Sequence, residues 1–88
     1  MIIKYESSFK KDLRHIKDEN LLKRIKKLIE KIKSADTLSE LTNLKKLKSY
    51  NSLYRIRLAD YRMGIEVTEN EIIFVRILHR KDIYRYFP

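Results

Sequence analysis

Residues 54–67, YRIRLADYRMGIEV, alternate between apolar and polar side chains, and this alternation constrains the fold more than any other feature of the chain. Apolar residues at every second position predict two strands that each bury one face. A two-residue turn at Ala59-Asp60 brings the apolar residues of both strands to the same side of the pair. Because a register shift of one residue would move one set to the opposite face, this agreement supports an antiparallel hairpin.

The other face of this hairpin carries a row of arginines. The register sets Arg57 directly opposite Arg62 and places Arg55 on the same face. Like charges that face each other across two strands are unfavourable. The row therefore requires either acidic partners, for which Glu66 and Glu71 are the candidates, or an anionic ligand that relieves the repulsion.

Two helices are predicted before the hairpin. After a short strand at residues 2–6, Ser7 and Ser8 are candidate N-caps of the first helix, and Asp18 is the candidate cap of the second. Two helices joined by so short a turn form an αα-hairpin with one shared apolar side. The apolar residues of the second helix lie on a single stripe at helical spacing: Leu21, Leu22, Ile25, Leu28, Ile29 and Ile32.

The remaining segments complete the predicted fold. Residues 34–43 are expected to be irregular, with one turn near Leu38. Residues 71–80, EIIFVRILHR, are apolar at nearly every position, which predicts a central strand covered on both faces. Residues 81–88 are expected to form a short C-terminal turn of helix. We therefore predict a single α+β domain over residues 1–88, in which the αα-hairpin packs on one face of a small antiparallel sheet in the order β-α-α-β-β-β.

The composition excludes several kinds of site. The chain has 88 residues, no cysteine and one glycine, so we expect no disulfide, no thiolate zinc site and no glycine-rich phosphate loop. The two histidines lie far apart in the sequence, and we expect neither a metal site nor a cofactor. The longest apolar runs are far too short to span a membrane. We expect a cytoplasmic protein.

The basic residues are divided unevenly along the chain, whose net charge is +9. The first half is rich in lysine, which suits solvated helix faces, whereas the second half is rich in arginine, whose planar fork suits bidentate binding of phosphate. Cations interleaved with aromatic rings indicate a nucleic-acid ligand, although packing of the C-terminal rings on the core is an alternative. The residues concerned are Arg55, Arg57, Arg62, Arg76, His79, Arg80, Lys81, Tyr84, Arg85 and Tyr86, with Lys45, Lys46 and Lys48 nearby.

The run YRIRLADYRMGIEV, followed by IIFVRILHRKDIYRYF, resembles the RelE/ParE superfamily of toxins from toxin-antitoxin pairs. Within the superfamily the chain is most similar to the RelE-type mRNA interferases. The resemblance implies a RelE-like fold and a ribosome-dependent endoribonuclease that cuts mRNA in the A site. In that reaction a ribose 2′-hydroxyl attacks the adjacent phosphate.

The resemblance also implies roles for individual residues. Its catalytic positions match Arg57, Arg62, His79, Lys81 and Tyr84. The family's basic residue after the last strand matches either Arg80 or Lys81. As basic residues near these positions, Arg55, Lys46, Lys48, Arg80 and Arg85 are expected to bind RNA. Some members of the family have lysines at the positions of Arg55 and Arg57. Because an arginine effectively never loses its proton, the general base stays open between Tyr84 and His79.

The partners that the resemblance implies are the ribosome, mRNA and a cognate antitoxin. We expect the antitoxin to be encoded in an adjacent reading frame and to be acidic, since a chain of charge +9 attracts an acidic partner. Two other functions stay open at this point. One is a gyrase-inhibiting toxin of the ParE branch, and the other is an RNA-binding module without catalysis.

Overall fold

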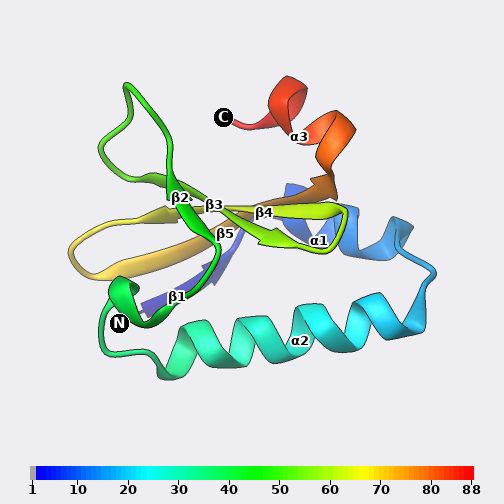
Figure 1. The fold of residues 1–88 in the computed structure, drawn as a ribbon, viewed down its shortest axis with the longest axis horizontal. Coiled ribbons are helices and arrows are strands. Elements are labelled where there is room, and N and C mark those ends of the chain that lie inside the picture. The colour runs from blue at the N-terminus through cyan, green and yellow to red at the C-terminus, as the bar shows by residue number, and fades with distance from the viewer. Residues whose placement is uncertain (1) are drawn as a thin grey trace.

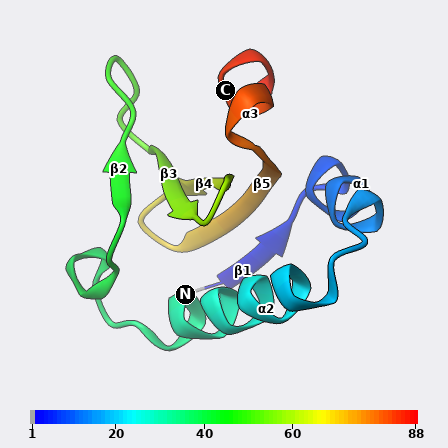
Figure 2. The same cartoon turned by 45° about the vertical axis from the view of Figure 1, so that its right-hand side comes forward.

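The computed structural model describes residues 2–88, within which five strands form one sheet in the order β1-β5-β4-β3-β2 (Figure 1). The strands are β1 (Ile2–Tyr5), β2 (Leu44–Lys46), β3 (Leu53–Leu58), β4 (Tyr61–Val67) and β5 (Glu71–His79). The helices are α1 (Ser7–His15), α2 (Glu19–Ser34) and α3 (Arg80–Tyr86), with a 3-10 turn at Leu38–Glu40. The helix α2 runs along one side of the sheet, and α3 stands on the opposite side (Figure 2).

The predicted α+β fold and the hairpin register are both confirmed. Strands β3 and β4 pair antiparallel around a turn at Ala59-Asp60, with Ile56 opposite Met63 and Arg57 opposite Arg62. Ile56 and Met63 are buried toward the helical layer, so the alternation did identify the core face. The arginines accordingly lie on the face away from α2.

The sheet differs from the prediction in two respects. Strand β2 was not predicted, and it pairs antiparallel with β3 at the edge of the sheet. Strand β1 pairs with β5 in parallel, so the sheet is mixed and not purely antiparallel. The strands β2 to β5 are joined by short turns that impose antiparallel pairing, whereas β1 reaches β5 through two helices. A connection of that length leaves the direction of pairing free.

The helices begin where the chain supplies acceptors for their first N–H groups. As predicted, Asp18 caps α2: its carboxylate accepts hydrogen bonds from the backbone N–H groups of Asn20 at 2.9 Å and Leu21 at 3.1 Å. The prediction of a serine cap for α1 is wrong, because the N-cap is Glu6 and both serines lie inside the first turn. The second of them, Ser8, instead donates to the sheet.

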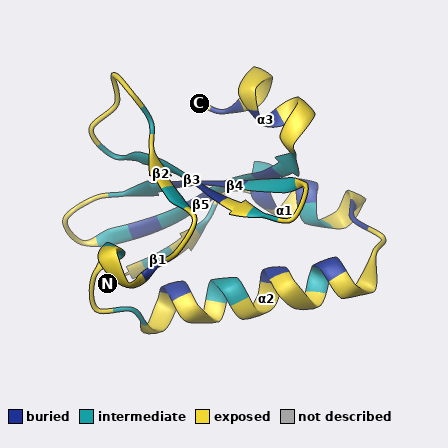
Figure 3. Cartoon of the chain, in the orientation of Figure 1, coloured by how far each residue is buried: buried dark blue, intermediate teal, exposed yellow. Residues whose placement is uncertain are grey.

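One hydrophobic core fills the space between α2, α1 and the sheet. The buried side of α2 contributes Leu21, Ile25 and Ile32, while its charged side faces outward (Figure 3). These side chains pack with Phe9 of α1 and Phe74 of β5, both fully buried. None of the helices described over residues 2–88 is long and apolar enough to cross a membrane.

Side chains of α1 complete the outer edge of β5. Strand β1 pairs only with the first part of β5, and beyond it Ser8 donates to the carbonyl of Val75 at 2.7 Å. The buried carboxylate of Asp12 accepts from the backbone N–H of Ile77 at 3.0 Å and holds Arg76 in a two-pronged ion pair at 2.8 and 2.9 Å. The hydrogen bond to Asp12 raises the pKa of Arg76 above its ordinary value. Arg76 is therefore a structural cation.

Candidate functional site

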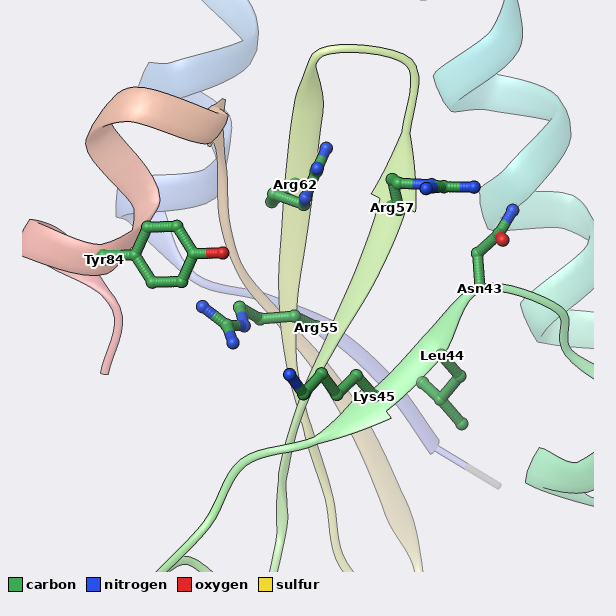
Figure 4. Close-up of a pocket in the computed structure, with 7 residues that line it drawn as sticks. All are labelled: Asn43, Leu44, Lys45, Arg55, Arg57, Arg62 and Tyr84. Atoms are coloured by element: carbon green, nitrogen blue, oxygen red, sulfur yellow. The ribbon is translucent and has the colours of Figure 1, made fainter.

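A groove of about 490 Å³ lies on the face of the sheet that α2 leaves open (Figure 4). Three strands and α3 contribute its walls. The residues that line the groove are Asn43, Leu44, Lys45, Arg55, Arg57, Arg62 and Tyr84. Four of these seven side chains are cations, and no carboxylate is among them, so the groove is suited to an anion.

The strand register collects these cations in adjacent rows. Lys45 of β2 lies opposite Arg55 of β3, and Arg57 of β3 lies opposite Arg62 of β4. The ion pairs found within residues 2–88 are Lys4 with Glu71 and Arg76 with Asp12, and neither includes a cation of the groove. The alternative in which Glu66 or Glu71 neutralises the row is therefore wrong.

Arg57 and Arg62 reduce their repulsion by pointing in different directions. The guanidinium of Arg62 turns toward the end of the hairpin, where it donates to the carbonyls of Ala59 at 3.0 Å and Tyr61 at 2.9 Å. The side chain of Arg57 points instead toward Asn43 (Figure 4). Neutral carbonyls thus hold Arg62 in place, and the positive charge of both residues stays available to a ligand.

The helix α3 brings a phenol to the groove. The hydroxyl of Tyr84 points over the sheet (Figure 4), and the Cζ atom of Arg55 lies 4.4 Å from the centre of its ring. The side chain is 68% exposed, so the hydroxyl is open to a ligand. The helix is anchored by Ile83 and Phe87, which are both buried.

The anchor of α3 rests on the single glycine of the chain. Gly64 lies on the arginine face, opposite Arg55. The ring of Phe87 sits against it so closely that a Cβ atom at this position would lie 2.7 Å from a ring carbon. The missing side chain of Gly64 therefore provides the space that lets α3 approach the groove.

The groove has the groups needed for chemistry on a phosphodiester. Fixed cations stabilise the extra negative charge that develops on a phosphate under attack, and a phenol can transfer a proton. Arginine effectively never loses its proton, so Tyr84 and Lys45 are the groups among the seven lining residues that can act as an acid or base.

Sequence comparison places the chain in a family. The sequence model of the ParE toxin of type II toxin-antitoxin systems, parDE, matches residues 3–84. The chain belongs to the RelE/ParE family of toxins. It is 46% identical to Toxin RelE3 of Methanocaldococcus jannaschii over 89 residues, which cover 100% of both chains. It is 33% identical to Putative toxin RelE1 of the same organism, over 82% of this chain and 80% of that one.

Solved structures agree with this placement. The RelB-RelE antitoxin-toxin complex from Methanococcus jannaschii matches with a TM-score of 0.82 and 45% identity, over 97% of this chain and 99% of that one. The fold also matches the archaeal RelE-RelB complex from Pyrococcus horikoshii, with a TM-score of 0.73 at 22% identity, over 90% and 93% of the two chains. By its close relatives the chain is a toxin of the RelE type, and RelE-type toxins are mRNA endoribonucleases.

The structure separates the site residues predicted for this RelE-type toxin into two groups. Arg55, Arg57, Arg62 and Tyr84 line the groove together. Outside its lining lie Lys46, Lys48, His79, Arg80, Lys81 and Arg85. Lys46 pairs with Tyr54 on β3, and the alternation of the strand directs it away from the groove, whereas its neighbour Lys45 faces it.

His79 has a structural contact that accounts for its position. It is the N-cap of α3, and its Nδ1 atom accepts a hydrogen bond from the backbone N–H of Lys81 at 3.2 Å. Its ring lies edge-on to Tyr61, with 5.6 Å between the ring centres. This arrangement places His79 at the start of the helix that carries Tyr84, and His79 does not line the groove.

Three residues of the groove, Asn43, Leu44 and Lys45, were not predicted as site residues from the sequence. Lys45 was named only as a neighbouring cation, because without β2 its facing could not be assigned. Asn43 has a backbone φ of 61°, the left-handed region that asparagine enters more readily than most residues. Its carbonyl accepts from the N–H of Arg57 at 3.1 Å, which ties the start of β2 to the arginine row.

Proposed function

We propose that this chain arrests translation in the cytoplasm by cutting mRNA in the ribosomal A site. The observation that carries the proposal is the groove itself, which is lined by three arginines without acidic partners within residues 2–88 and by an exposed tyrosine. The ribosome would present a codon to this groove as a single strand. The chain would then need no deep pocket of its own.

In the proposed reaction the 2′-hydroxyl of one nucleotide attacks the phosphate that follows it. The products are a 2′,3′-cyclic phosphate and a free 5′-hydroxyl. Arg57 and Arg62 bind the phosphate, whose negative charge rises in the pentacoordinate transition state. Because β3 and β4 fix the backbones of both arginines beside the phosphate, their charges stabilise the transition state more than the starting diester.

Proton transfer in this scheme belongs to Tyr84. Its hydroxyl faces the arginines from α3, and the stacked guanidinium of Arg55 holds the ring. A positioned acid or base contributes about 10²–10⁴-fold to such a reaction. Lys45 and Arg55 lie one row further along the sheet, where they contact the neighbouring backbone of the RNA.

We further propose that an acidic antitoxin holds this toxin inactive. The RelE of Methanococcus jannaschii that this chain resembles was solved together with RelB, its antitoxin. A chain with charge +9 and an uncovered row of cations favours a partner that supplies carboxylates. Such a partner prevents cleavage by neutralising the groove.

The experiment that tests the function is brief induction of the chain in a host, followed by mapping of mRNA 5′ ends. We expect new 5′-hydroxyl ends inside A-site codons, which appear only on translated messages. The same RNA incubated with the protein and without ribosomes should stay intact. Translated messages without new ends would contradict the proposal.

The match to ParE toxins makes gyrase inhibition the second candidate. It predicts double-strand DNA breaks in induced cells and intact mRNA. The third candidate, an RNA-binding module without catalysis, predicts slowed translation with neither kind of break. Measuring mRNA ends and DNA breaks in the same culture separates the three.

A further inference from the structure

A second basic pocket adjoins the groove on the far side of the Arg57–Arg62 pair. Its volume is about 510 Å³. The residues that line it are Arg24, Asn43, Arg57, Leu58, Ala59, Asp60, Arg62 and Arg80. Three of them, Asn43, Arg57 and Arg62, also line the groove, so the two hollows are continuous across the end of the hairpin.

Three elements distant in the sequence supply the arginines of this second pocket. Arg24 comes from α2, Arg80 from the start of α3, and Arg57 and Arg62 from the hairpin. The backbone N–H of Arg80 donates to the carbonyl of Asp60 at 2.7 Å, which fixes the first turn of α3 against the hairpin. The convergence of α2 and α3 on the hairpin thus gathers four arginines in one pocket.

The charge balance of the pocket strongly favours an anion. Four guanidinium groups face a single carboxylate, that of Asp60. Within residues 2–88 none of these arginines forms an ion pair. Arg57 lines both hollows, and its side chain points toward Asn43, which also lines both (Figure 4), so the same residue can reach ligands in either.

We propose that this pocket is a second phosphate-binding subsite for the same RNA strand, and that Arg24 is its distinguishing residue. The inference rests on the proposed function. The scissile phosphate lies in the groove at Arg57 and Arg62, and the backbone of an adjacent nucleotide continues over the hairpin end to Arg24 and Arg80. A strand bound at both hollows is held in line with the attacking hydroxyl, which favours cleavage.

An RNA strand fits these observations better than an acidic protein segment. The second pocket shares three lining residues with the groove, as expected when one continuous ligand passes from one to the other. Its arginine forks match phosphate oxygens, and its lining has few of the apolar side chains that anchor protein interfaces. Binding of an acidic segment is therefore the outcome that would contradict the proposal.

The test measures binding of a single-stranded oligonucleotide that carries 2′-O-methyl groups and is therefore not cleaved. Arg24→Ala should weaken binding about tenfold at low salt, because it removes one charged contact to a phosphate. It should also lower the slope of log affinity against log salt by about 0.7, the value for one phosphate of a single strand. Arg24 is exposed, so the fold should be kept. Arg14→Ala removes the same charge from α1, outside both hollows, and should change neither quantity.

Two further measurements make the assignment specific. With a dinucleotide, which has a single internucleotide phosphate, Arg24→Ala should bind as the parent does, since the short ligand occupies the groove alone. Asp60→Asn removes the one carboxylate of the pocket and should tighten binding of the longer strand. Equal binding of Arg24→Ala and parent to the longer strand would overturn the subsite, as would weakened binding to an acidic antitoxin with unchanged binding to RNA.

Failure of the subsite is distinguishable from failure of the proposed function. Binding is measured with an uncleavable strand, whereas the function is measured by mRNA ends. A parent that cuts mRNA while Arg24→Ala binds and cuts equally well would overturn only the subsite. A parent that cuts nothing, with Arg24→Ala still weakened on the longer strand and unaffected on the dinucleotide, would support the subsite and overturn the cleavage.

Discussion

Arg57 and Arg62 face each other across β3 and β4 although their charges are alike. Removing one of them should therefore stabilise the free protein. Arg57→Thr relieves a like-charge cross-strand pair, worth about 0.2–1 kcal/mol in the free energy of unfolding. It also introduces a residue that favours strands, and it keeps the backbone N–H that donates to Asn43. We expect a higher melting temperature together with weaker mRNA cleavage.

The melting temperatures of parent and Arg57→Thr in sulfate show whether the facing pair of Arg57 and Arg62 binds an anion. An anion that binds only the folded state stabilises it, so sulfate should raise the melting temperature of the parent more than that of Arg57→Thr. Sodium chloride at the same ionic strength serves as the control. A variant that melts below the parent, with equal gains from sulfate, would mean that Arg57 has a structural role.

The role of proton donor or acceptor can be assigned between Tyr84 and His79 by a matched pair of variants. Tyr84→Phe keeps the ring on Arg55 and removes only the hydroxyl, and we expect mRNA cleavage to fall by about 10²–10⁴-fold. His79→Asn keeps an oxygen that can cap α3, so both the fold and the cleavage rate should be retained. The measurement is the rate of A-site cleavage. Normal cleavage by Tyr84→Phe with loss in His79→Asn would reverse the assignment.

At the scale of single residues, the sequence was informative wherever strict alternation determined which face of the sheet a side chain occupies. The alternation alone assigns Arg55, Arg57 and Arg62 to one face, since their facing depends on a single turn. Lys45 and Lys46 could not be distinguished, because neighbouring residues face opposite sides and their strand was not recognised. The position of Arg24 in the same pocket as the hairpin end depends on how α2 packs on the sheet, which no local pattern encodes.

At the scale of elements, α3 determines whether Tyr84 reaches the groove. The helix has only seven residues and is held by Ile83 and by Phe87 on Gly64. An isolated helix of this length is unstable in water, so its position depends on these two anchors. The one glycine of the chain therefore contributes to the site without contacting the ligand.

Gly64→Ala should displace α3, because the new Cβ atom would lie 2.7 Å from the ring of Phe87. We expect a loss of about 1–3 kcal/mol in the free energy of unfolding, as for other overpacked sites, together with a large fall in cleavage. The double variant Gly64→Ala with Phe87→Leu should recover part of both, since the smaller side chain leaves room. Melting curves and cleavage rates of Gly64→Ala, Phe87→Leu and the double variant, compared with the parent, give the coupling between the two positions. Effects that simply add would contradict the proposed contact.

Two features that the sequence did not predict, the strand β2 and a bulge in β5, both depend on pairing with a neighbouring strand. Strand β2 has three residues and no alternation of its own, and it is ordered by pairing with β3. In β5 the pairing shifts between Gly64 and Ile65, which leaves Val75 as an extra residue in a bulge. The bulge changes the facing of every later residue, so the parity of Arg76 relative to Phe74 could not be read from the sequence.

At the scale of the whole molecule, opposite sides carry different kinds of cation. The outer side of α2 is rich in exposed lysine, whereas the open face of the sheet holds arginine. Lysines on a solvated helix maintain solubility and attract acidic partners over long distances, while the arginines bind what arrives. The two functions call for different tests, because long-range attraction is screened by salt much more than close contact is.

The net charge of +9 therefore predicts how an acidic antitoxin reaches the toxin. The association rate constant should fall by at least about tenfold between low and high salt, whereas the dissociation rate constant should change much less, since steering acts on encounter and not on the docked complex. Stopped-flow mixing with the product of an adjacent reading frame measures both. Replacing Lys23 and Lys27 on the outer side of α2 by glutamine should lower the association rate constant and its salt dependence while mRNA cleavage stays normal, because neither lysine lines the groove or the second pocket. An association rate constant that does not depend on salt would show that the charge of the molecule does not guide the partner.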